Sequence, residues 1–344
     1  MKLFDLQPKT TREDLFDREK ELNELHKAID KDYPLTALLG IRRIGKTSIL
    51  KTFINEVNGI YIDMRQITKR ADLQMRITDS LTNSLSRIKK FIEGIRGLKI
   101  ADLSIEIRWK GSDSISLAGL LEEINKKNEK FVLIFDEVQS LKPPVSSELK
   151  KLIAYAYDNL ENIKFIVAGS EIGMLQNFLG YEDPSSPLYG RAVYEINVER
   201  FSKEKSREFL RKGFQEERVE PRPELIEKAI EFFDGIVGWL VIFGREYIDG
   251  INNMEKIKEN AINLALSELE KLNPKEKMVL KAIASGSKTW ISVRNYINEK
   301  YGIVIPKSTL SRLIDKLEKL SILYEYEFQD NVYMEAVKRM RVNI

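Results

Sequence analysis

Cysteine is absent from the 344 residues, and histidine occurs only once. Without thiolates the chain cannot form disulfides, iron–sulfur clusters or cysteine-based zinc sites. The single histidine, His26, cannot build a histidine-rich metal centre, and its setting in "ELNELHKAID" is typical of a partly exposed helix position. We therefore expect neither a metal centre of these kinds nor a catalytic histidine.

Long apolar runs and a strong net charge are also missing. No stretch is long enough to span a bilayer and no signal peptide is recognisable, so we expect a cytoplasmic protein without membrane contact. The net charge is only +3, from 56 basic and 53 acidic residues, so any basic surface must be local. With 43% hydrophobic residues, a chain of this length can build a large core and more than one domain.

Nearly continuous apolar runs in the first 200 residues are typical of strands in a parallel sheet that is covered on both faces. They fall at 35–40, 59–64, 130–137, 163–170 and 192–198. Helical patterns separate them, so we predict a doubly wound α/β core over 1–200. The long connection near 71–130 contains a helical stretch and the alternating segment "LKIADLSIEIRWKG", which predicts an insertion with a small hairpin.

The strand pattern ends near residue 200. From 201 to 271, apolar residues spaced three and four apart predict a helical lid, with helix starts at Ser202 and Pro223. After "LNPKEK" come three helical patterns and two short strand-like runs, "YEYEF" and "VYMEA", joined by "QDN". This order predicts a C-terminal winged helix-turn-helix over 272–344.

The segment "LTALLGIRRIGKTSIL" (35–50) contains a phosphate-binding pattern between a strand and a helix. It matches G-x-x-x-x-G-K-[ST], in which glycines and a helix N-terminus direct backbone N–H groups at phosphates. Lys46 would neutralise the β- and γ-phosphate oxygens, and the Thr47 hydroxyl would bind Mg²⁺. We therefore predict an ATP and Mg²⁺ site that includes Gly40, Arg43, Ile44, Gly45, Lys46, Thr47 and Ser48.

Two further strand ends carry polar residues that suit phosphoryl chemistry. "FVLIFDEVQ" ends in Asp136, which would hold Mg²⁺ through water, and Glu137, which would polarise the attacking water; alternatively, both are ordinary acids at a solvated strand end. Ser170, in "FIVAGSEIG", would sense the γ-phosphate or orient water, since ligands of open α/β sheets bind at the carboxyl ends of strands. Its alternative role is to cap the following helix.

At this point the chain resembles the archaeal ATPase family, which belongs to the P-loop signal-transduction ATPases with numerous domains and is related to AAA+ proteins. Five segments carry the resemblance in the family's order: "FDREKEL" (16–22), "GIRRIGKTS" (40–48), "LIFDEVQ" (133–139), "VAGSEIGM" (167–174) and "SPLYGRA" (186–192). The resemblance covers nearly the whole chain. It implies an ASCE/AAA+-like core with ATPase activity.

The resemblance also implies roles for individual residues. Phe16, Arg18 and Glu19 would line the adenine and ribose pocket; alternatively, they begin a helix with Asp17 as its N-cap. Arg191 would reach the γ-phosphate, in its own subunit or a neighbouring one, where an arginine stabilises charge in phosphoryl transfer; alternatively, it is a surface residue at the start of a strand.

The predicted lid departs from the family at one place. Relatives carry a Gly-Gly-x-Pro-like element where the lid meets the adenine, whereas this chain has "DGIVGWL", with Asp234 and Val237 in place of glycine and proline. Gly238 fits the family pattern and is a candidate nucleotide contact. Trp239 is expected to belong to the lid core. Loss of the proline removes a fixed backbone turn, so the sequence does not determine the geometry of the lid at this point.

The predicted winged helix carries a modest positive charge: residues 270–344 contain 14 Lys and Arg against 9 Asp and Glu. In a recognition helix at 306–320, the residues expected to contact DNA are Ser308, Ser311, Arg312, Lys316 and Lys319. Acids of the predicted wing, Glu325, Glu327 and Asp330, disfavour close approach to phosphate. The alternative is a module that docks on protein.

These observations support two main hypotheses. The first is a slowly hydrolysing ATP-dependent switch, whose nucleotide state controls the positions of the lid and the winged helix. The second is an ATP-regulated DNA-binding protein that resembles origin-recognition ATPases. A sensor that binds a protein partner or self-associates is a third possibility. The chemistry of the phosphate loop does not require Arg42 or Arg43, which we expect to be solvated or, alternatively, to face a neighbour or the winged helix.

Overall fold

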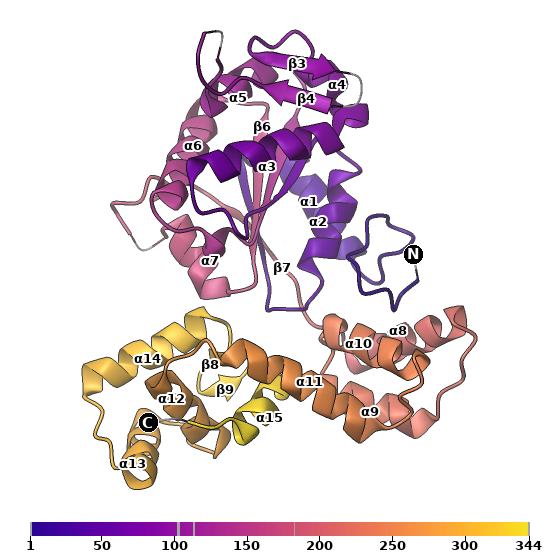
Figure 1. Cartoon of the computed structure of the whole chain (residues 1–344), viewed down its shortest axis with the longest axis vertical. Helices are drawn as coiled ribbons and strands as arrows, with labels where there is room; N and C mark the ends of the chain where they lie inside the picture. Colours follow the sequence, from indigo (N-terminus) through magenta and orange to yellow (C-terminus); the bar gives the residue numbers. More distant parts are fainter. Residues whose placement is uncertain (1, 102–103, 113, 182, 343–344) are drawn as a thin grey trace.

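The computed structural model describes residues 2–101, 104–112, 114–181 and 183–342. In Figure 1 an α/β part, formed by the first 200 residues, lies above a mainly helical part formed by residues 201–342, here called the helical body. Within these described residues, no helix combines the length and the apolar character needed to cross a membrane.

A five-stranded parallel sheet forms the centre of the α/β part, as predicted. Its strand order is β2-β5-β6-β1-β7. The strands are β1 (Leu35–Leu39), β2 (Gly59–Asp63), β5 (Phe131–Asp136), β6 (Ile163–Gly169) and β7 (Tyr194–Asn197). Every residue of β1, β5 and β6 is buried, because helices cover both faces of the sheet.

Two helical layers enclose the sheet. On one face lie α1 (Glu19–Asp30) and α2 (Lys46–Ile54). The other face is covered by α3 (Arg70–Asn83), α5 (Leu117–Asn125), α6 (Val145–Asn159) and α7 (Ile172–Leu179), with the short 3₁₀ helix η1 (Val138–Ser140) after β5. The insertion forms α4 (Leu85–Ile92) and the antiparallel hairpin of β3 (Leu98–Ala101) and β4 (Ser104–Ile107), which confirms the predicted hairpin.

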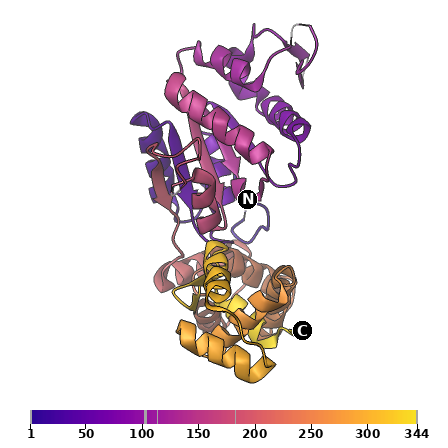
Figure 2. The ribbon, with the colours of Figure 1, turned by 90° about the vertical axis from the view of Figure 1, so that its left-hand side faces the viewer.

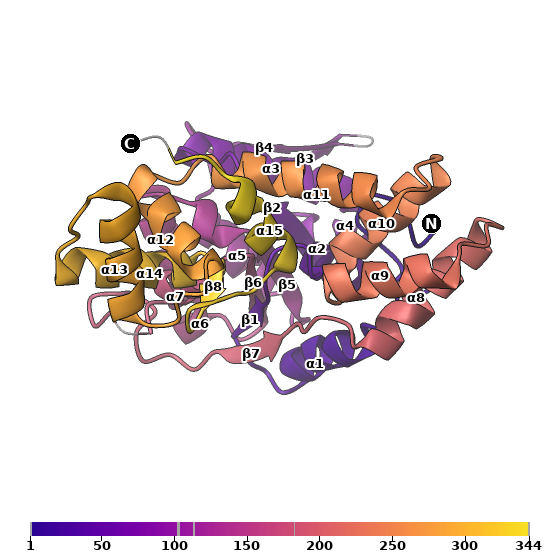
Figure 3. The same cartoon turned by 90° about the horizontal axis from the view of Figure 1, so that it is seen from below.

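The helical body begins with the four lid helices, α8 (Lys203–Glu216), α9 (Pro223–Phe233), α10 (Val237–Ile248) and α11 (Met254–Leu269). Ser202 caps α8 by accepting a hydrogen bond from the Lys205 N–H, and Pro223 occupies the first position of α9, so both predicted starts are confirmed. The winged helix follows, seen from below in Figure 3. It contains α12 (Pro274–Ala284), α13 (Trp290–Tyr301), α14 (Lys307–Lys319), β8 (Leu323–Tyr324), β9 (Glu327–Phe328) and α15 (Asn331–Arg339).

The predicted second wing strand, "VYMEA", is wrong, because this segment belongs to α15. Its buried residues Val332, Tyr333, Ala336 and Val337 recur at helical spacing, and Asp330 caps the helix by accepting a hydrogen bond from the Val332 N–H at 2.8 Å. The wing is a short hairpin of β8 and β9 that turns at residues 325 and 326, both of which have positive φ. Asp330 is therefore a buried cap, not an acid on an exposed wing.

One hydrophobic core runs through the lid and the winged helix. Trp239 and Phe243 of the lid lie in the same buried cluster as Leu280, Leu310 and Val337 of the winged helix. The sheet has two separate clusters of its own, one on each face. Figure 2 shows the helical body gathered below the sheet. The lid and the winged helix therefore pack as one body rather than as two independently packed domains.

The shared core generates a prediction about stability. Leu280→Ala, at a fully buried position of α12, should destabilise the body by about 2–5 kcal/mol, because it leaves a cavity in the core. In hydrogen-exchange mass spectrometry, we expect protection to fall in α8–α11 together with α12–α15. Lys275→Ala, at an exposed position of the same helix, is the control. Loss of protection confined to residues 272–342 would contradict a common core.

Candidate functional site

The loop between β1 and α2 has the backbone geometry that its glycines suggested. Gly45 has a φ of +100°, which side-chain-bearing residues rarely adopt. A Cβ on Gly40 would lie 3.0 Å from both the Ile44 side chain and the Val198 carbonyl oxygen. Lys46 is buried, and its Nζ donates to the carbonyl oxygens of Gly40 and Ile41 at 2.6 and 2.9 Å. Burial lowers the pKa of Lys46 to about 8.

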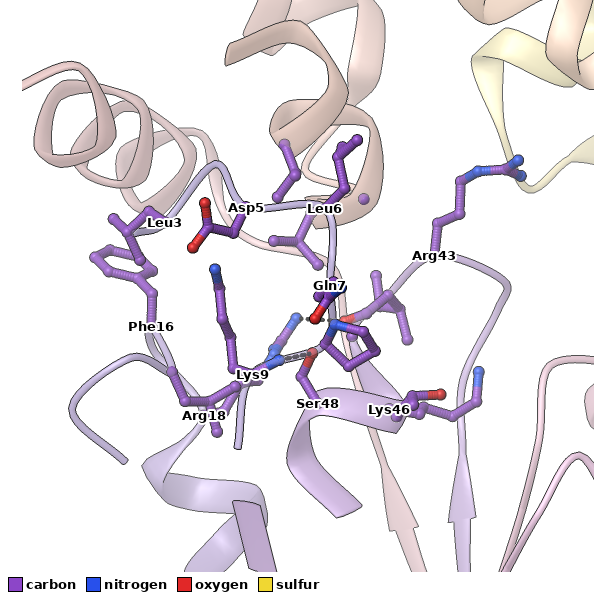
Figure 4. Close-up of a pocket in the computed structure, with 18 of the residues that line it drawn as sticks. Leu3, Asp5, Leu6, Gln7, Lys9, Phe16, Arg18, Arg43, Lys46 and Ser48 are labelled. Atoms are coloured by element: carbon purple, nitrogen blue, oxygen red, sulfur yellow. Dashed lines mark hydrogen bonds between the residues drawn. The ribbon is translucent and has the colours of Figure 1, made fainter. Parts of the chain in front are cut away.

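A cavity of about 340 Å³ lies beside this loop, within the size range of small-molecule sites. Figure 4 shows part of its wall. Most of the predicted site residues line it: Phe16, Arg18, Arg43, Ile44, Gly45, Lys46, Thr47, Ser48, Glu137, Ser170 and Gly238. The structure thus brings together residues from the phosphate loop, from two strand ends, from the segment before α1 and from the lid.

Asp136 lies next to the loop with one oxygen available for a ligand. Its Oδ2 accepts hydrogen bonds from the hydroxyls of Thr47 and Tyr61, both at 2.8 Å. Its Oδ1 is buried and has no hydrogen-bond partner. Burial raises the pKa of Asp136, against the two hydroxyl donors. A buried carboxylate oxygen beside a threonine hydroxyl fits Mg²⁺, which proteins bind through one or two such groups together with phosphates.

Glu137 is held by two neighbours on the same edge of the sheet. Its Oε2 accepts from Ser170 Oγ at 2.9 Å and from Gln139 Nε2 at 2.5 Å. Ser170 does not cap α7, because the N-cap position is Glu171 and that cap has no side-chain hydrogen bond. Gln139 was missed by the sequence analysis. Gly169 makes room for it, since a Cβ there would lie 2.2 Å from Gln139 Oε1.

The segment before α1 contributes Arg18 and Phe16 but not Glu19. Arg18 donates to the Ile44 carbonyl oxygen at 3.0 Å, and its guanidinium lies 4.5 Å from the ring centre of Phe201. Glu19 is exposed and does not line the cavity, because the next helix position points about 100° away from Arg18. The structure therefore does not bring Glu19 to the cavity with Arg18 and Phe16.

Asp17 is not the predicted N-cap of α1. Arg18 occupies that position, and the cap has no side-chain hydrogen bond. Asp17 adopts a positive φ of 52° and pairs with Lys205 of α8, with 3.2 Å between Oδ1 and Nζ. This segment therefore turns toward the lid before the helix begins.

Arg43 is not solvated; it ties the phosphate loop to the helical body. Its guanidinium lies 4.0 Å from the ring centre of Trp239 and donates to both carboxylate oxygens of Glu268, at 3.2 and 2.5 Å. Its backbone carbonyl accepts from the Gly238 N–H at 2.8 Å. In Figure 4 the Arg43 side chain extends away from the cavity. The sequence analysis expected Arg43 to be solvated or to face a neighbour or the winged helix, whereas it contacts the lid, through Trp239 and Glu268.

Glu268, in the lid helix α11, accepts hydrogen bonds from two other parts of the chain. Besides Arg43, it accepts from the Tyr333 hydroxyl of α15, and Arg42 Nη1 lies 3.3 Å from its carboxylate. Burial would raise the pKa of Glu268, but the hydrogen bonds from Arg43 and Tyr333 outweigh burial and lower it. Glu268 therefore connects the phosphate loop, the lid and the winged helix.

The lid turn "DGIVGWL" forms without the proline of the family pattern. Asp234 takes a left-handed conformation at the end of α9, which aspartate tolerates better than most residues. Gly235 has a φ of 72°, and a Cβ there would lie 2.0 Å from the Phe201 carbonyl oxygen. Val237 begins α10 and lines the cavity. Trp239 is fully buried, which confirms its place in the lid core.

Arg191 does not reach the cavity of its own chain. It lies before β7, which runs parallel to β1, whereas the phosphate loop follows the end of β1. Arg191 and the phosphate loop therefore lie at opposite ends of these two neighbouring strands. Arg191 donates to both carboxylate oxygens of Asp158, at 3.2 and 2.6 Å. A contact with the nucleotide of the same chain is incompatible with this arrangement.

The helix α14, predicted as a recognition helix, is exposed at its start and faces α7 at its end. Ser308, Ser311 and Arg312 are exposed. Further along, a Cβ on Gly173 of α7 would lie 2.7 Å from the Lys319 Cα, and Ser321 Oγ accepts from the Ile172 N–H at 2.8 Å. Figure 1 shows α14 directly below α7.

Two further basic residues of α14 form ion pairs within the winged helix. Lys316 pairs with Glu276 of α12 at 2.5 Å, and Lys319 pairs with Asp315 at 2.9 Å. Lys316 was predicted to contact DNA phosphates, a role that would require it to leave Glu276.

Comparisons with known proteins define the class of protein to which this chain belongs. Residues 15–243 match the model of the ATPase domain found predominantly in Archaea, and the chain belongs to that family. Residues 270–335 match the C-terminal winged helix-turn-helix domain of MCM proteins.

A solved structure, the Walker-type ATPase of Pyrococcus abyssi, is 36% identical with a TM-score of 0.86, over 98% of this chain and 99% of that one. The ORC2 protein of Aeropyrum pernix is 14% identical with a TM-score of 0.58, over 98% and 96% of the two chains, and so shares the fold.

Two curated relatives come from Methanocaldococcus jannaschii. One is an uncharacterized protein, 24% identical over 84% of this chain, and the other an uncharacterized ATP-binding protein, 26% identical over 57% of it. The chain spans 58% and 62% of the lengths of these relatives.

The ion pair at Glu268 should make stability depend on pH in the acidic range. Because the folded-state pKa of Glu268 is lowered, the pair contributes stability above the ordinary glutamate pKa and loses it as the pH falls through the lowered value. Glu268→Gln should therefore be less stable than wild type at pH 7, by about 1–3 kcal/mol. The difference should shrink as the pH falls below about 4.

Urea denaturation at several pH values measures this difference. Glu255→Gln, at an exposed position in the first turn of the same helix, is the matched control and should change stability little at any pH. A Glu268→Gln deficit that stays constant from pH 7 to pH 3 would show that the carboxylate charge is not the cause.

Proposed function

We propose that this protein is an ATP-dependent switch that binds ATP with Mg²⁺, hydrolyses it slowly and changes the position of the helical body with its nucleotide state. One observation carries the proposal: the loop that would surround the phosphates also holds the helical body, through Arg43 and Glu268. A change in the loop therefore has a direct route to the lid and the winged helix.

The residues of the cavity have distinct tasks in this proposal. Lys46 binds the β- and γ-phosphates, for which it exchanges its hydrogen bonds to the loop carbonyls. Thr47 and Asp136 hold the metal ion, which would stabilise negative charge on the phosphate oxygens. Gly45 and Ile44 direct backbone groups at the anion, at the start of α2.

Slow hydrolysis is supported by the surroundings of Glu137. One of its carboxylate oxygens already accepts hydrogen bonds from Ser170 and Gln139. A general base must be free to accept a hydrogen bond from the attacking water. These donors stabilise the carboxylate charge, so Glu137 would polarise water only weakly through its other oxygen, and we expect slow turnover for this reason.

The switch can be tested by a distance measurement. Since the chain has no cysteine, cysteines introduced for Lys151 on α6 and Lys275 on α12 can be labelled selectively. We expect ATP with Mg²⁺ to change the distance between the labels in wild type and in Glu137→Gln, which should bind but not turn over. Lys46→Ala should abolish binding and the change together.

Arg43→Met tests the route of coupling, because it keeps an apolar stem beside Trp239 but removes the ion pair. It should retain nucleotide binding and lose most of the distance change, whereas Arg42→Met, at a more exposed position, should behave like wild type. Unchanged distances on saturation with ATP in wild type would contradict the switch, and equal ATP binding by Lys46→Ala would contradict the phosphate loop.

DNA binding is a second candidate function, which the exposed first half of α14 and the match to an MCM winged helix favour. Ser308, Ser311 and Arg312 would contact the DNA, with Lys316 on a phosphate. In filter binding, the logarithm of affinity should fall linearly with the logarithm of salt concentration. Arg312→Ala should weaken binding by about tenfold.

Lys338→Ala, on α15, is the matched control, because α15 packs against the lid helices α9 and α11. It should leave both the affinity and the salt slope unchanged. Absence of a negative salt slope in wild type would exclude DNA as the partner. A protein ligand or a second copy of the chain would then be the partner of the helical body.

A further inference from the structure

Residues 2–9 cross from the lid to the phosphate-loop helix along the wall of the cavity. These residues are called the strap below. Asp5, Leu6, Gln7 and Pro8 line the cavity on this side, opposite Arg18 and the loop. Figure 4 shows the strap running from Leu3 past Asp5 and Leu6 and then down to Lys9, above Arg18 and Ser48.

The lid end of the strap is anchored by Phe4. Its ring is 1% exposed and makes edge-on contacts with Phe209 and Phe214, at 5.8 and 4.9 Å between ring centres. Two lid glycines form the slot: a Cβ on Gly213 or Gly244 would lie 2.3 or 2.5 Å from the Phe4 ring. The ring therefore fits only because α8 and α10 both carry glycine there.

Polar contacts reinforce both ends. At the lid end, the Leu3 N–H donates to Glu216 at 2.8 Å and Lys2 pairs with Glu217 at 2.6 Å. At the other end, the Lys9 N–H donates to Ser48 Oγ in the first turn of α2, at 3.1 Å. The strap thus spans the two elements between which a nucleotide would lie.

The middle of the strap is less firmly held than its anchors. The Leu6 side chain is 67% exposed, so the strap covers the cavity as a single layer of chain. A segment of this kind can open locally without unfolding the lid. A ligand retained by the closed form leaves at a rate set by how often the strap opens.

We infer that the strap is part of the nucleotide site and sets the rate of nucleotide exchange, with Phe4 as the positioning residue that keeps it closed. This inference rests on the proposed binding of ATP. Release of the bound nucleotide requires the Phe4 ring to leave its slot. Since the slot is formed by two lid helices, a movement that separates α8 from α10 also frees the strap.

Release of a fluorescent ADP analogue, chased with excess ADP in a stopped-flow instrument, measures exchange in the full chain. Phe4→Ala should accelerate release by about tenfold or more, with a much smaller effect on the association rate. Phe4→Leu, which keeps an apolar side chain in the slot, should restore most of the retention. Gly213→Ala should also accelerate release, because the added Cβ would displace the Phe4 ring from its slot.

A double-mutant cycle distinguishes loss of the Phe4 contact from a general destabilisation of the lid. Without the ring the added Cβ has room, so Phe4→Ala with Gly213→Ala should release no faster than Phe4→Ala alone. Phe233→Ala removes a buried lid ring that makes no ring contact with Phe4, and should leave release near the wild-type rate.

Three results would overturn the inference: unchanged release in Phe4→Ala, additive effects in the double variant, or equal acceleration in Phe233→Ala. Failure of the wild-type protein to bind the analogue, or equal binding by Lys46→Ala, would instead count against the proposed function. The two failures are therefore distinguishable in the same experiment.

Discussion

The contact between Arg43 and Glu268 determines how the two parts of this molecule are joined. A largely buried ion pair adds little net stability, because desolvation offsets most of the attraction, but removing one partner leaves an uncompensated charge. Such a pair therefore selects one arrangement over others. Here it selects the arrangement in which Trp239 covers the Arg43 guanidinium and Tyr333 donates to Glu268. Charges on a bound triphosphate would act on the same loop, and so on the same ion pair.

The shared core of the helical body connects this contact to both the lid and the winged helix. Because the lid and the winged helix are packed around one cluster, a displacement of Glu268 in the proposed switch would move both, as in a rigid-body rotation. The winged helix touches the sheet part again at α7, where Ser321 accepts from the Ile172 N–H. That contact lies two residues beyond Ser170, which holds Glu137. The strand end that carries Glu137 is therefore only a few bonds from the winged helix.

The features that could be predicted from the sequence are those determined by residues close together in the chain. Lys46, Thr47 and Asp136 were recognisable because strand ends in a parallel sheet share one edge, and spacing along the chain determines their positions. The prediction of a second wing strand was wrong because a segment of five residues fits a short helix as well as a strand. Asp330, which caps α15, favours the helix. Gln139, Tyr61 and the strap were missed, since their roles arise from contacts between distant segments. Arg43 was left open for the same reason: its partner lies 225 residues away.

A single helix, α10, links these contacts. Gly238 and Trp239 at its start meet Arg43 of the phosphate loop, and Gly244, about 9 Å further along the axis, forms one wall of the slot for Phe4. Both contacts are made by the same twelve-residue helix, α10. Any tilt that breaks the Arg43 contact also shifts the wall against which Phe4 packs. In the proposed switch, retention of the nucleotide and the position of the winged helix would therefore be coupled through α10, whose close packing at both contacts requires glycine.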